Sequence, residues 1–328
     1  MKKIISITVF VITAAASFGM SDPRMRMVDK IRIREAISIS QKFGDSIWEG
    51  ISQVPFAIIL VTDSVEFLVY HTNPPVDFKL SEKDTVLRAD IFFRKRQYSK
   101  NWLATFPVNG INCIVAGIPE NTGRGSTEWI ITLLHEHFHQ YEYSQPGYYA
   151  DVEKLELSGG DQTGMWMLNY PFPYGEKTII GLYDKYVSAL AEAAGNIDSK
   201  GFEKKFNKYK TSRKKFSKRL LTADYRYFSF QIWQEGIARY TEYKFLEKLA
   251  GYIPSSEIVQ LKDFISFAEC KRRFLELQFS ELAKLELSKA QRVCFYAIGF
   301  AEGILLDKIN PGWRAGFFTN KFYLEKMQ

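Results

Sequence analysis

The sequence has few cysteines and histidines and no internal repeat. Its 328 residues include 3 Cys, 4 His, 11 Pro and 21 Gly. The modest Pro and Gly content and the lack of a short period exclude collagen-like, linker-rich and solenoid proteins. With 46% hydrophobic and 15% aromatic residues, the composition instead indicates a globular protein of one large or two smaller domains.

The excess of positive over negative charge is also small. Lys and Arg total 44 and Asp and Glu total 37, which gives a net charge of +7. An excess of this size favours solubility and a weak attraction to anions, but it is not typical of nucleic-acid-binding proteins. We therefore expect no nucleic acid among the partners of this protein.

Long hydrophobic runs are missing except near the N-terminus. Residues 1–19, MKKIISITVFVITAAASFG, combine two lysines, an apolar run and a cluster of small residues, which predicts a secretory signal peptide. The alternative is an uncleaved membrane anchor, but the apolar run of about 13 residues is shorter than the roughly 20 that a spanning helix needs. We expect residues 20–328, with a net charge of +5, to be periplasmic or secreted and to have no transmembrane segment.

The chain has only three cysteines, an odd number, so they do not form a disulfide framework. Cys113 lies in an apolar run, and Cys270 and Cys294 lie in amphipathic segments, so buried free thiols are expected. A single Cys270–Cys294 bridge in an oxidising compartment is the alternative.

The hydrophobic pattern changes along the chain from strand-like to helical. Residues 25–46 predict a first helix, which is followed by strands at 56–62, 65–71, 85–93, 103–108 and 111–117. A helix is predicted near 128–143, and further helices at 177–194, 202–221, 225–249, 256–275 and 290–309. Residues 275–287 fit a strand or a helix equally well.

This pattern predicts an α+β protein. We expect a small mixed or antiparallel sheet packed on the helix near 128–143, followed by a mainly helical C-terminal half. The predicted division is residues 20–144 for the subdomain with the sheet and residues 145–328 for the helical subdomain.

Three of the four histidines are crowded into the string HEHFH, in which His135, Glu136 and His139 match the pattern H-E-x-x-H. On a helix, His135 and His139 are one turn apart, so both imidazoles can face one ion. The adjacent Glu136 can then take a proton from a water molecule, which is the arrangement that zinc hydrolysis needs. A random chain of the same length and composition would contain this pattern only about 0.006 times, so coincidence is a poor explanation for it. His137 falls on another side of the helix and is expected at the surface or in packing.

A catalytic Zn²⁺ needs a third protein ligand. The extended pattern H-E-x-x-H-x-x-G-x-x-H is excluded because Glu142 and Gln145 occupy its Gly and third His positions. A carboxylate from a second helix remains, and the two candidates are Glu235 and Glu302, each followed by Gly. Glu235 is preferred because Arg239 and Glu242 follow it one and two turns later on the same helix face. Either residue could form a supporting contact with a ligand or the motif helix, or the two could simply form an ion pair within their helix.

A second motif accompanies Glu235. Its residues are Trp233, Glu235, Gly236, Ala238, Tyr240 and Glu242. Together with HEHFH, this string resembles the gluzincin class of zinc metallopeptidases and is similar to its aminopeptidase branch. The resemblance implies Glu235 as third ligand, Glu136 as general base, and an antiparallel-edged sheet against the motif helix with a helical domain behind it.

The chain also differs from the aminopeptidase branch. Ninety-five residues separate His139 from Glu235, far more than in that branch, and no G-x-M-E-N motif precedes the helix. Enzymes of the gluzincin kind often use a Tyr to stabilise the oxyanion, and Tyr296, 61 residues after Glu235, has a similar place. We predict that Tyr296 is this donor.

Two segments between the motifs have a functional and a structural interpretation. Residues 140–230 can form a wall over the active site, or their aromatic side chains can be ordinary core. Residues 202–220 carry nine Lys or Arg on an amphipathic helix, which allows a weak contact with the cell envelope. A core-facing aromatic stripe with a solvated basic face is the preferred interpretation of this helix.

The prediction is therefore a periplasmic or secreted zinc-dependent metallopeptidase with one Zn²⁺ and a peptide or protein substrate. One alternative is a non-catalytic envelope-associated zinc protein that contacts polyanions through residues 202–220. The other is a metal-dependent amidase that acts on a non-peptide amide, because the chemistry at the carbonyl carbon would be the same.

Overall fold

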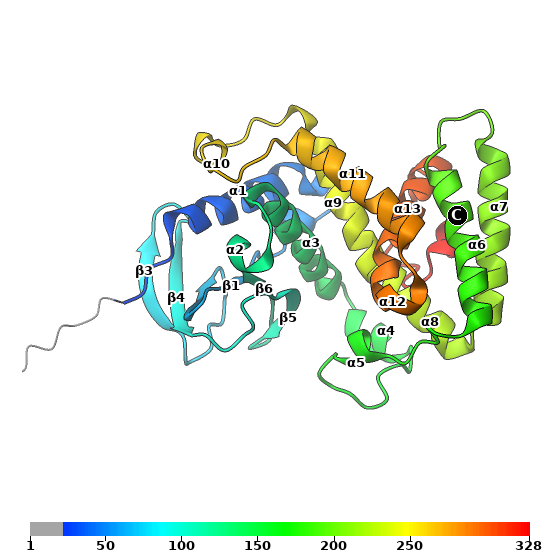
Figure 1. Ribbon diagram of the computed structural model, residues 1–328. Helices are drawn as coiled ribbons and strands as arrows, with labels where there is room; N and C mark the ends of the chain where they lie inside the picture. The colour runs from blue at the N-terminus through cyan, green and yellow to red at the C-terminus, as the bar shows by residue number, and fades with distance from the viewer. Residues whose placement is uncertain (1–21) are drawn as a thin grey trace, which may run out of the picture.

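The computed structural model describes residues 22–328, and the predicted signal peptide lies outside the described residues. Figure 1 shows a sheet at one end of the molecule and a group of helices at the other. Helix α3 (Ser126–Ser144) lies between them, beside α9 (Ile237–Lys248). The fold is mixed α+β, as predicted.

One six-stranded mixed sheet forms the N-terminal part. Its strands are β1 (Ile58–Val61), β2 (Val65–Val69), β3 (Lys79–Asp84), β4 (Ala89–Lys95), β5 (Leu103–Val108) and β6 (Ile111–Gly117), in the order β3-β4-β2-β1-β6-β5. Strands β1 and β6 pair in parallel, and the other neighbours are antiparallel. Strand β5 is therefore an edge strand, and it contacts α3.

Local sequence explains the central strands and the hairpin turn. Every residue of β1 is buried because the sheet is covered on both faces there, which explains its unbroken apolar run IILV. The turn between β5 and β6 uses Asn109 and Gly110, both with positive φ, as tight hairpin turns require. Strand β3 was not predicted, because its sequence KLSEKD is polar and largely exposed at the sheet edge.

Helices dominate the rest of the chain. The main ones are α1 (Met27–Phe43), α6 (Lys177–Ala194), α7 (Phe202–Arg219), α8 (Thr222–Gln231), α11 (Phe267–Lys284) and α13 (Cys294–Ile309). Short helices are α2 (Pro119–Thr122), α4 (Tyr148–Glu153), α5 (Trp166–Asn169), α10 (Ser256–Val259) and α12 (Leu287–Ala290). The mainly helical C-terminal half is thus observed.

Two helix predictions were wrong in detail. The predicted helix at 225–249 is α8, a π-helical turn (Ile232–Gly236) and α9. The predicted helix at 256–275 stops after α10, and the next helix, α11, begins at Phe267. Tertiary contacts explain the gap, because Asp263 accepts hydrogen bonds from Ser126 and the Thr127 hydroxyl donates to the Ile265 carbonyl at 2.6 Å. Residues 275–284, where the sequence allowed a strand or a helix, belong to helix α11.

The basic helix α7 packs its aromatic stripe against α6. Phe202, Phe206, Tyr209 and Phe216 are buried, whereas its lysines lie on the opposite, mostly exposed face. The core-facing interpretation of this segment is therefore confirmed. An envelope contact through residues 202–220 stays a prediction.

The three cysteines are free and buried, so the Cys270–Cys294 bridge that the sequence left open does not form in this structure. Burial raises the pKa of the Cys270 thiol to about 12, which keeps it protonated and unreactive. Within residues 22–328, no helix combines the length and the apolar character needed to cross a bilayer.

Candidate metal centre

Helix α3 places the two motif imidazoles side by side. The Nε2 atoms of His135 and His139 are 3.2 Å apart, and both side chains are buried. The Oε2 atom of Glu235 lies 3.7 Å from Nε2 of His135 and 3.5 Å from Nε2 of His139. Tetrahedral zinc with ligand bonds of about 2.0–2.1 Å would separate its ligand atoms by about 3.3 Å. The three atoms therefore already have nearly the spacing that one zinc ion requires.

Glu235 is separated from His139 by 95 residues in the sequence, but the fold brings its carboxylate beside the two imidazoles. It lies in the π-helical turn Ile232–Gly236 between α8 and α9, and α9 packs against α3. π-Helical turns are rare in proteins, and many of those that occur lie at functional sites. A Cβ atom on Gly236 would lie 2.4 Å from the Cα of Gly299 on α13, so the turn and α13 can touch only because both residues are glycine.

Each imidazole has a carboxylate behind it. Nδ1 of His135 is 2.7 Å from Oε1 of Glu242, and Nδ1 of His139 is 2.7 Å from Oε2 of Glu142. Donation from Nδ1–H leaves both Nε2 lone pairs directed toward Glu235, and it orients the rings as metal-binding histidines require. Arg239 pairs with Glu242 at 3.2 Å. The supporting position expected for Glu242 is therefore observed.

The sequence interpretation missed Glu142 as a partner of His139. It was considered only as the residue that excludes the extended histidine pattern. Its position three residues after His139 on the same helix was the available signal, because such residues are neighbours on a helix surface. The histidine cluster is thus symmetrical, with one buried carboxylate behind each imidazole.

The electrostatics of the cluster favour a cation. Burial opposes the ionisation of Glu235, but its interaction with His135 and His139 holds the pKa of this carboxyl well below its ordinary value. Burial also opposes the charging of His139, yet Glu142 and Glu235 raise the pKa of this imidazole well above its ordinary value. The carboxylates beside the two imidazoles thus favour positive charge at this cluster, and a divalent metal ion could supply it.

Glu136 is oriented by the edge strand of the sheet. The Thr105 hydroxyl on β5 lies 2.9 Å from Oε2 of Glu136 and 2.9 Å from the backbone carbonyl oxygen of the same residue. Glu136 is buried and lies next to His135 in the chain, but it does not belong to the group of three ligand atoms. Its carboxylate is therefore free of the ligand role.

Tyr296 lies at the same site. Its ring stacks on His135, with the ring centroids 6.3 Å apart and the planes at 11°. Its hydroxyl accepts a hydrogen bond of 3.1 Å from Nη1 of Arg292. Burial, together with the charge of Glu235, raises the pKa of Tyr296 well above its ordinary value, so the hydroxyl keeps its proton at neutral pH. Helix α13 thus brings the predicted oxyanion donor beside the predicted ligands.

The rival ligand Glu302 lies elsewhere. Its Oε1 accepts hydrogen bonds from Nε of Arg213 at 2.7 Å, from the Tyr186 hydroxyl at 2.5 Å and from the Tyr209 hydroxyl at 2.9 Å. This carboxylate is neutralised within the helical half and is not part of the histidine cluster. Glu302 is therefore not the third ligand in this arrangement.

His137 belongs to the core. It packs on Phe56 with the ring centroids 4.5 Å apart, and its Nδ1 is 2.8 Å from Oε1 of Gln140. Burial lowers the pKa of His137 to about 4, so this imidazole is neutral. The packing alternative is correct for His137, and the surface alternative is wrong.

The segment between the two motifs is largely core near the site. Trp166 stacks on Phe230, and Tyr170 stacks on Tyr227. Tyr143 stacks on His139 at 5.9 Å. The aromatic-core interpretation therefore describes these residues, and a wall over the active site stays a prediction.

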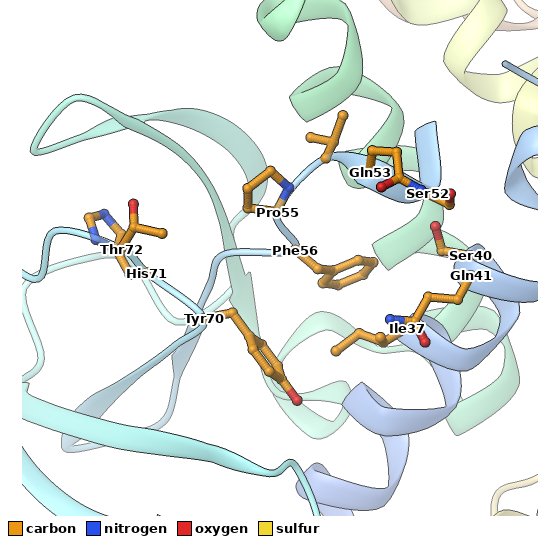
Figure 2. A pocket seen from close by; sticks show the side chains of 11 residues that line it. Ile37, Ser40, Gln41, Ser52, Gln53, Pro55, Phe56, Tyr70, His71 and Thr72 are labelled. Carbon is orange, nitrogen blue, oxygen red and sulfur yellow. Dashed lines mark hydrogen bonds between the residues drawn. The ribbon is translucent and has the colours of Figure 1, made fainter. Parts of the chain in front are cut away.

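A cavity of about 490 Å³ lies away from the histidine cluster, between α1, the end of β2 and the chain before β1. Figure 2 shows Ile37, Phe56 and Tyr70 gathered around it. None of the three ligand candidates lines this cavity. It is a feature separate from the metal centre.

The donor set fits zinc. Two imidazole nitrogens and one carboxylate oxygen are typical of catalytic zinc sites, whereas structural zinc usually has four protein ligands. Within residues 22–328, no fourth His, Cys, Asp or Glu joins the cluster. Comparisons with family models, curated proteins and solved structures give no match for this chain.

Proposed function

We propose that this protein is a periplasmic or secreted zinc-dependent metallopeptidase in which His135, His139 and Glu235 hold one Zn²⁺. The observation that carries this proposal is the convergence of their three ligand atoms, spaced 3.2–3.7 Å apart. The gluzincin resemblance belongs to this proposal and rests on the two sequence motifs, HEHFH and the segment around Glu235. The compartment rests on the signal-peptide pattern in residues 1–19.

Zinc supplies Lewis acidity and lowers the pKa of a coordinated water to about 7. Glu136 is the general base in this proposal, because a carboxylate next to a ligand can accept the proton of the attacking water. The Thr105 hydroxyl, 2.9 Å from Glu136, orients this carboxylate. Glu136 then delivers the proton to the leaving amine.

Tyr296 donates a hydrogen bond to the oxygen that becomes negative when water attacks the carbonyl carbon. Its buried hydroxyl is protonated at neutral pH, and the N–H of Arg292 that it accepts polarises it further as a donor. The ring that carries this hydroxyl is held in place by its stacking on His135.

The edge strand β5 supports a peptide as the substrate. Within the described sheet, β5 pairs only with β6, and Thr105 in this strand contacts Glu136. An extended peptide could add to the outer edge of β5 through main-chain hydrogen bonds and so reach the catalytic carboxylate. A small non-peptide amide would gain nothing from this edge.

The test uses residues 20–328 loaded with one equivalent of zinc and a mixed peptide library. We expect chelator-sensitive cleavage, and we expect Glu136→Gln to lower turnover by about 10²–10⁴-fold while about one zinc per chain is retained. Glu153→Gln, which removes the same charge from an exposed position on α4, is the matched control and should leave turnover unchanged.

Undiminished cleavage by Glu136→Gln would refute its role as general base. Hydrolysis of simple amides without any cleavage of peptides would favour the amidase. Zinc binding without hydrolysis, combined with complete unfolding on chelation, would favour the non-catalytic zinc protein.

A further inference from the structure

Arg292 carries a guanidinium group at the metal centre that is only partly used. It lies just before α13, and its side chain keeps 25% of its surface exposed. Its hydrogen bond to the Tyr296 hydroxyl accounts for one of its five N–H donors. The only carboxylate oxygen within ion-pair range among the described residues is Oε1 of Glu235, at 3.9 Å. This distance is too long for a direct hydrogen bond.

Other buried arginines of the molecule differ from Arg292. Arg213 has a carboxylate oxygen of Glu302 at 2.7 Å and one of Glu325 at 3.1 Å. Arg239 has its carboxylate partner, Glu242, at 3.2 Å. The charge of each is paired with a carboxylate oxygen at 2.7–3.2 Å, whereas Arg292 has none closer than 3.9 Å and keeps part of its surface exposed to a ligand.

The backbone that precedes Arg292 is strained. Gln291 has φ of 50° and ψ of −130°, a region that residues with a side chain rarely adopt. Such conformations persist only where the surrounding structure imposes them, and they cluster at functional sites. The strain at Gln291 turns the chain from α12 into α13 and so sets the position of Arg292 beside Tyr296 and Glu235.

The chemistry of a guanidinium indicates what it would recognise. Its planar fork matches the two oxygens of a carboxylate, and a partly desolvated pair of this kind gives both affinity and orientation. One extended residue spans about 3.5 Å. A carboxylate bound at Arg292 would therefore lie one or two residues from a carbonyl group held near His135 and Glu235.

On the basis of the proposed function, we propose that Arg292 is a specificity-determining residue that binds a substrate carboxylate one or two residues from the scissile bond. This carboxylate can be the C-terminus of a short peptide or an acidic side chain. The shared chemistry is a carboxylate, and a matched set of substrates separates the two sources.

The first test compares kcat/KM of the zinc-loaded chain for peptide pairs that differ in one group. One pair has a free or an amidated C-terminus, and the other has Glu or Gln beside the cleaved bond. We expect a preference of about 10- to 100-fold for the carboxylate in one pair, and the pair that shows it identifies the source. Arg292→Gln should abolish this preference, and Arg292→Lys should restore part of it because the charge remains.

Lys289→Gln is the matched control. It removes the same charge from an exposed side chain of the neighbouring helix α12, and it should leave the preference intact. Equal kcat/KM within both pairs would overturn the proposal. So would an equal loss on all four substrates in Arg292→Gln, because Arg292 would then act only through its hydrogen bond to Tyr296 or in folding.

A binding measurement separates this inference from the proposed function. The same peptides are titrated calorimetrically into the zinc-loaded Glu136→Gln chain, with and without Arg292→Gln. If the wild-type chain cleaves no peptide, the proposed function fails, but carboxylate-selective binding that depends on Arg292 would still support the inference. Equal dissociation constants for the acid and the amide of both pairs would refute it whether or not cleavage occurs.

Discussion

Two glutamate–glycine pairs on buried helical segments have similar local sequences, but their carboxylates face different partners. Glu235 faces two imidazole nitrogens at 3.5–3.7 Å, and Glu302 accepts hydrogen bonds from one arginine and two tyrosines. The carboxylate of Glu302 is fully neutralised by protein donors. The carboxylate of Glu235 faces two nitrogen atoms that are themselves candidate metal ligands, and the proposed function places its partner outside the chain.

The glycines of the two pairs have a common role in packing. A Cβ on Gly236 would lie 2.4 Å from the Cα of Gly299, and a Cβ on Gly303 would lie 2.6 Å from the ring of Tyr240. In both cases the missing side chain lets two helical segments approach closely. The glutamate–glycine signature therefore indicates close helix packing, and the function depends on what faces the carboxylate.

The largest expected difference between the pairs is in zinc affinity. Glu235→Ala removes one of three protein ligands and should weaken zinc binding by about 100- to 1,000-fold, because a binding free energy of about 10–16 kcal/mol at a site with four ligands corresponds to about 2.5–4 kcal/mol for each. Glu302→Ala should leave the affinity unchanged if the variant is folded. Competition with a chromogenic chelator measures both values. Equal affinities of the two variants would contradict the assignment of Glu235.

For the free energy of unfolding, we expect the larger effect from the Glu302 variant. Glu302→Ala leaves the buried Arg213 without its nearest carboxylate and should lower the free energy of unfolding by about 3–5 kcal/mol. Glu235→Ala should cost less in zinc-free protein, because His135 and His139 keep their closer carboxylate partners, Glu242 and Glu142, at 2.7 Å. Urea unfolding in the presence of a chelator measures this difference. A larger loss for Glu235→Ala would show that Glu235 has the structural role.

The tyrosines near the two glutamates should differ in the same way. Tyr296→Phe should lower kcat by about 10²-fold, a typical effect of losing an oxyanion donor, with little change in stability. Tyr186→Phe removes a hydrogen bond to the Glu302 carboxylate and should cost about 1.5–3 kcal/mol of stability without a change in kcat. Steady-state kinetics and thermal unfolding of the same two preparations provide the comparison.

The smallest expected effects are at the carboxylates behind the imidazoles. Glu142→Gln and Glu242→Gln keep the shape of the side chain but remove its charge, and each should weaken zinc binding by about 10- to 100-fold. Zinc titration of the two variants against the wild-type chain is the measurement. An effect in only one of them would show that the two imidazoles are not equally supported.

Much of the fold followed from local patterns, and the failures have identifiable causes. Alternating and unbroken apolar runs located the central strands, whereas the polar edge strand β3 has no such pattern. The start of α11 was misplaced because Ser126 and Thr127, about 140 residues earlier in the chain, bind residues 263–265. A window of neighbouring residues contains no information about contacts of this kind.

The same division applies to the metal centre. Helix geometry alone places His135 and His139 on one face, so the sequence determined this pair without reference to the rest of the chain. The sequence favoured Glu235 over Glu302 through Arg239 and Glu242 on its helix face, but only the packing of α3, α9 and α13 showed which of the two carboxylates lies beside the histidines. Arg292 and Tyr296 are neighbours in the sequence, but the partly used guanidinium of Arg292 became visible as part of the site only when helix packing brought it near Glu235, since proximity across the chain depends on tertiary contacts.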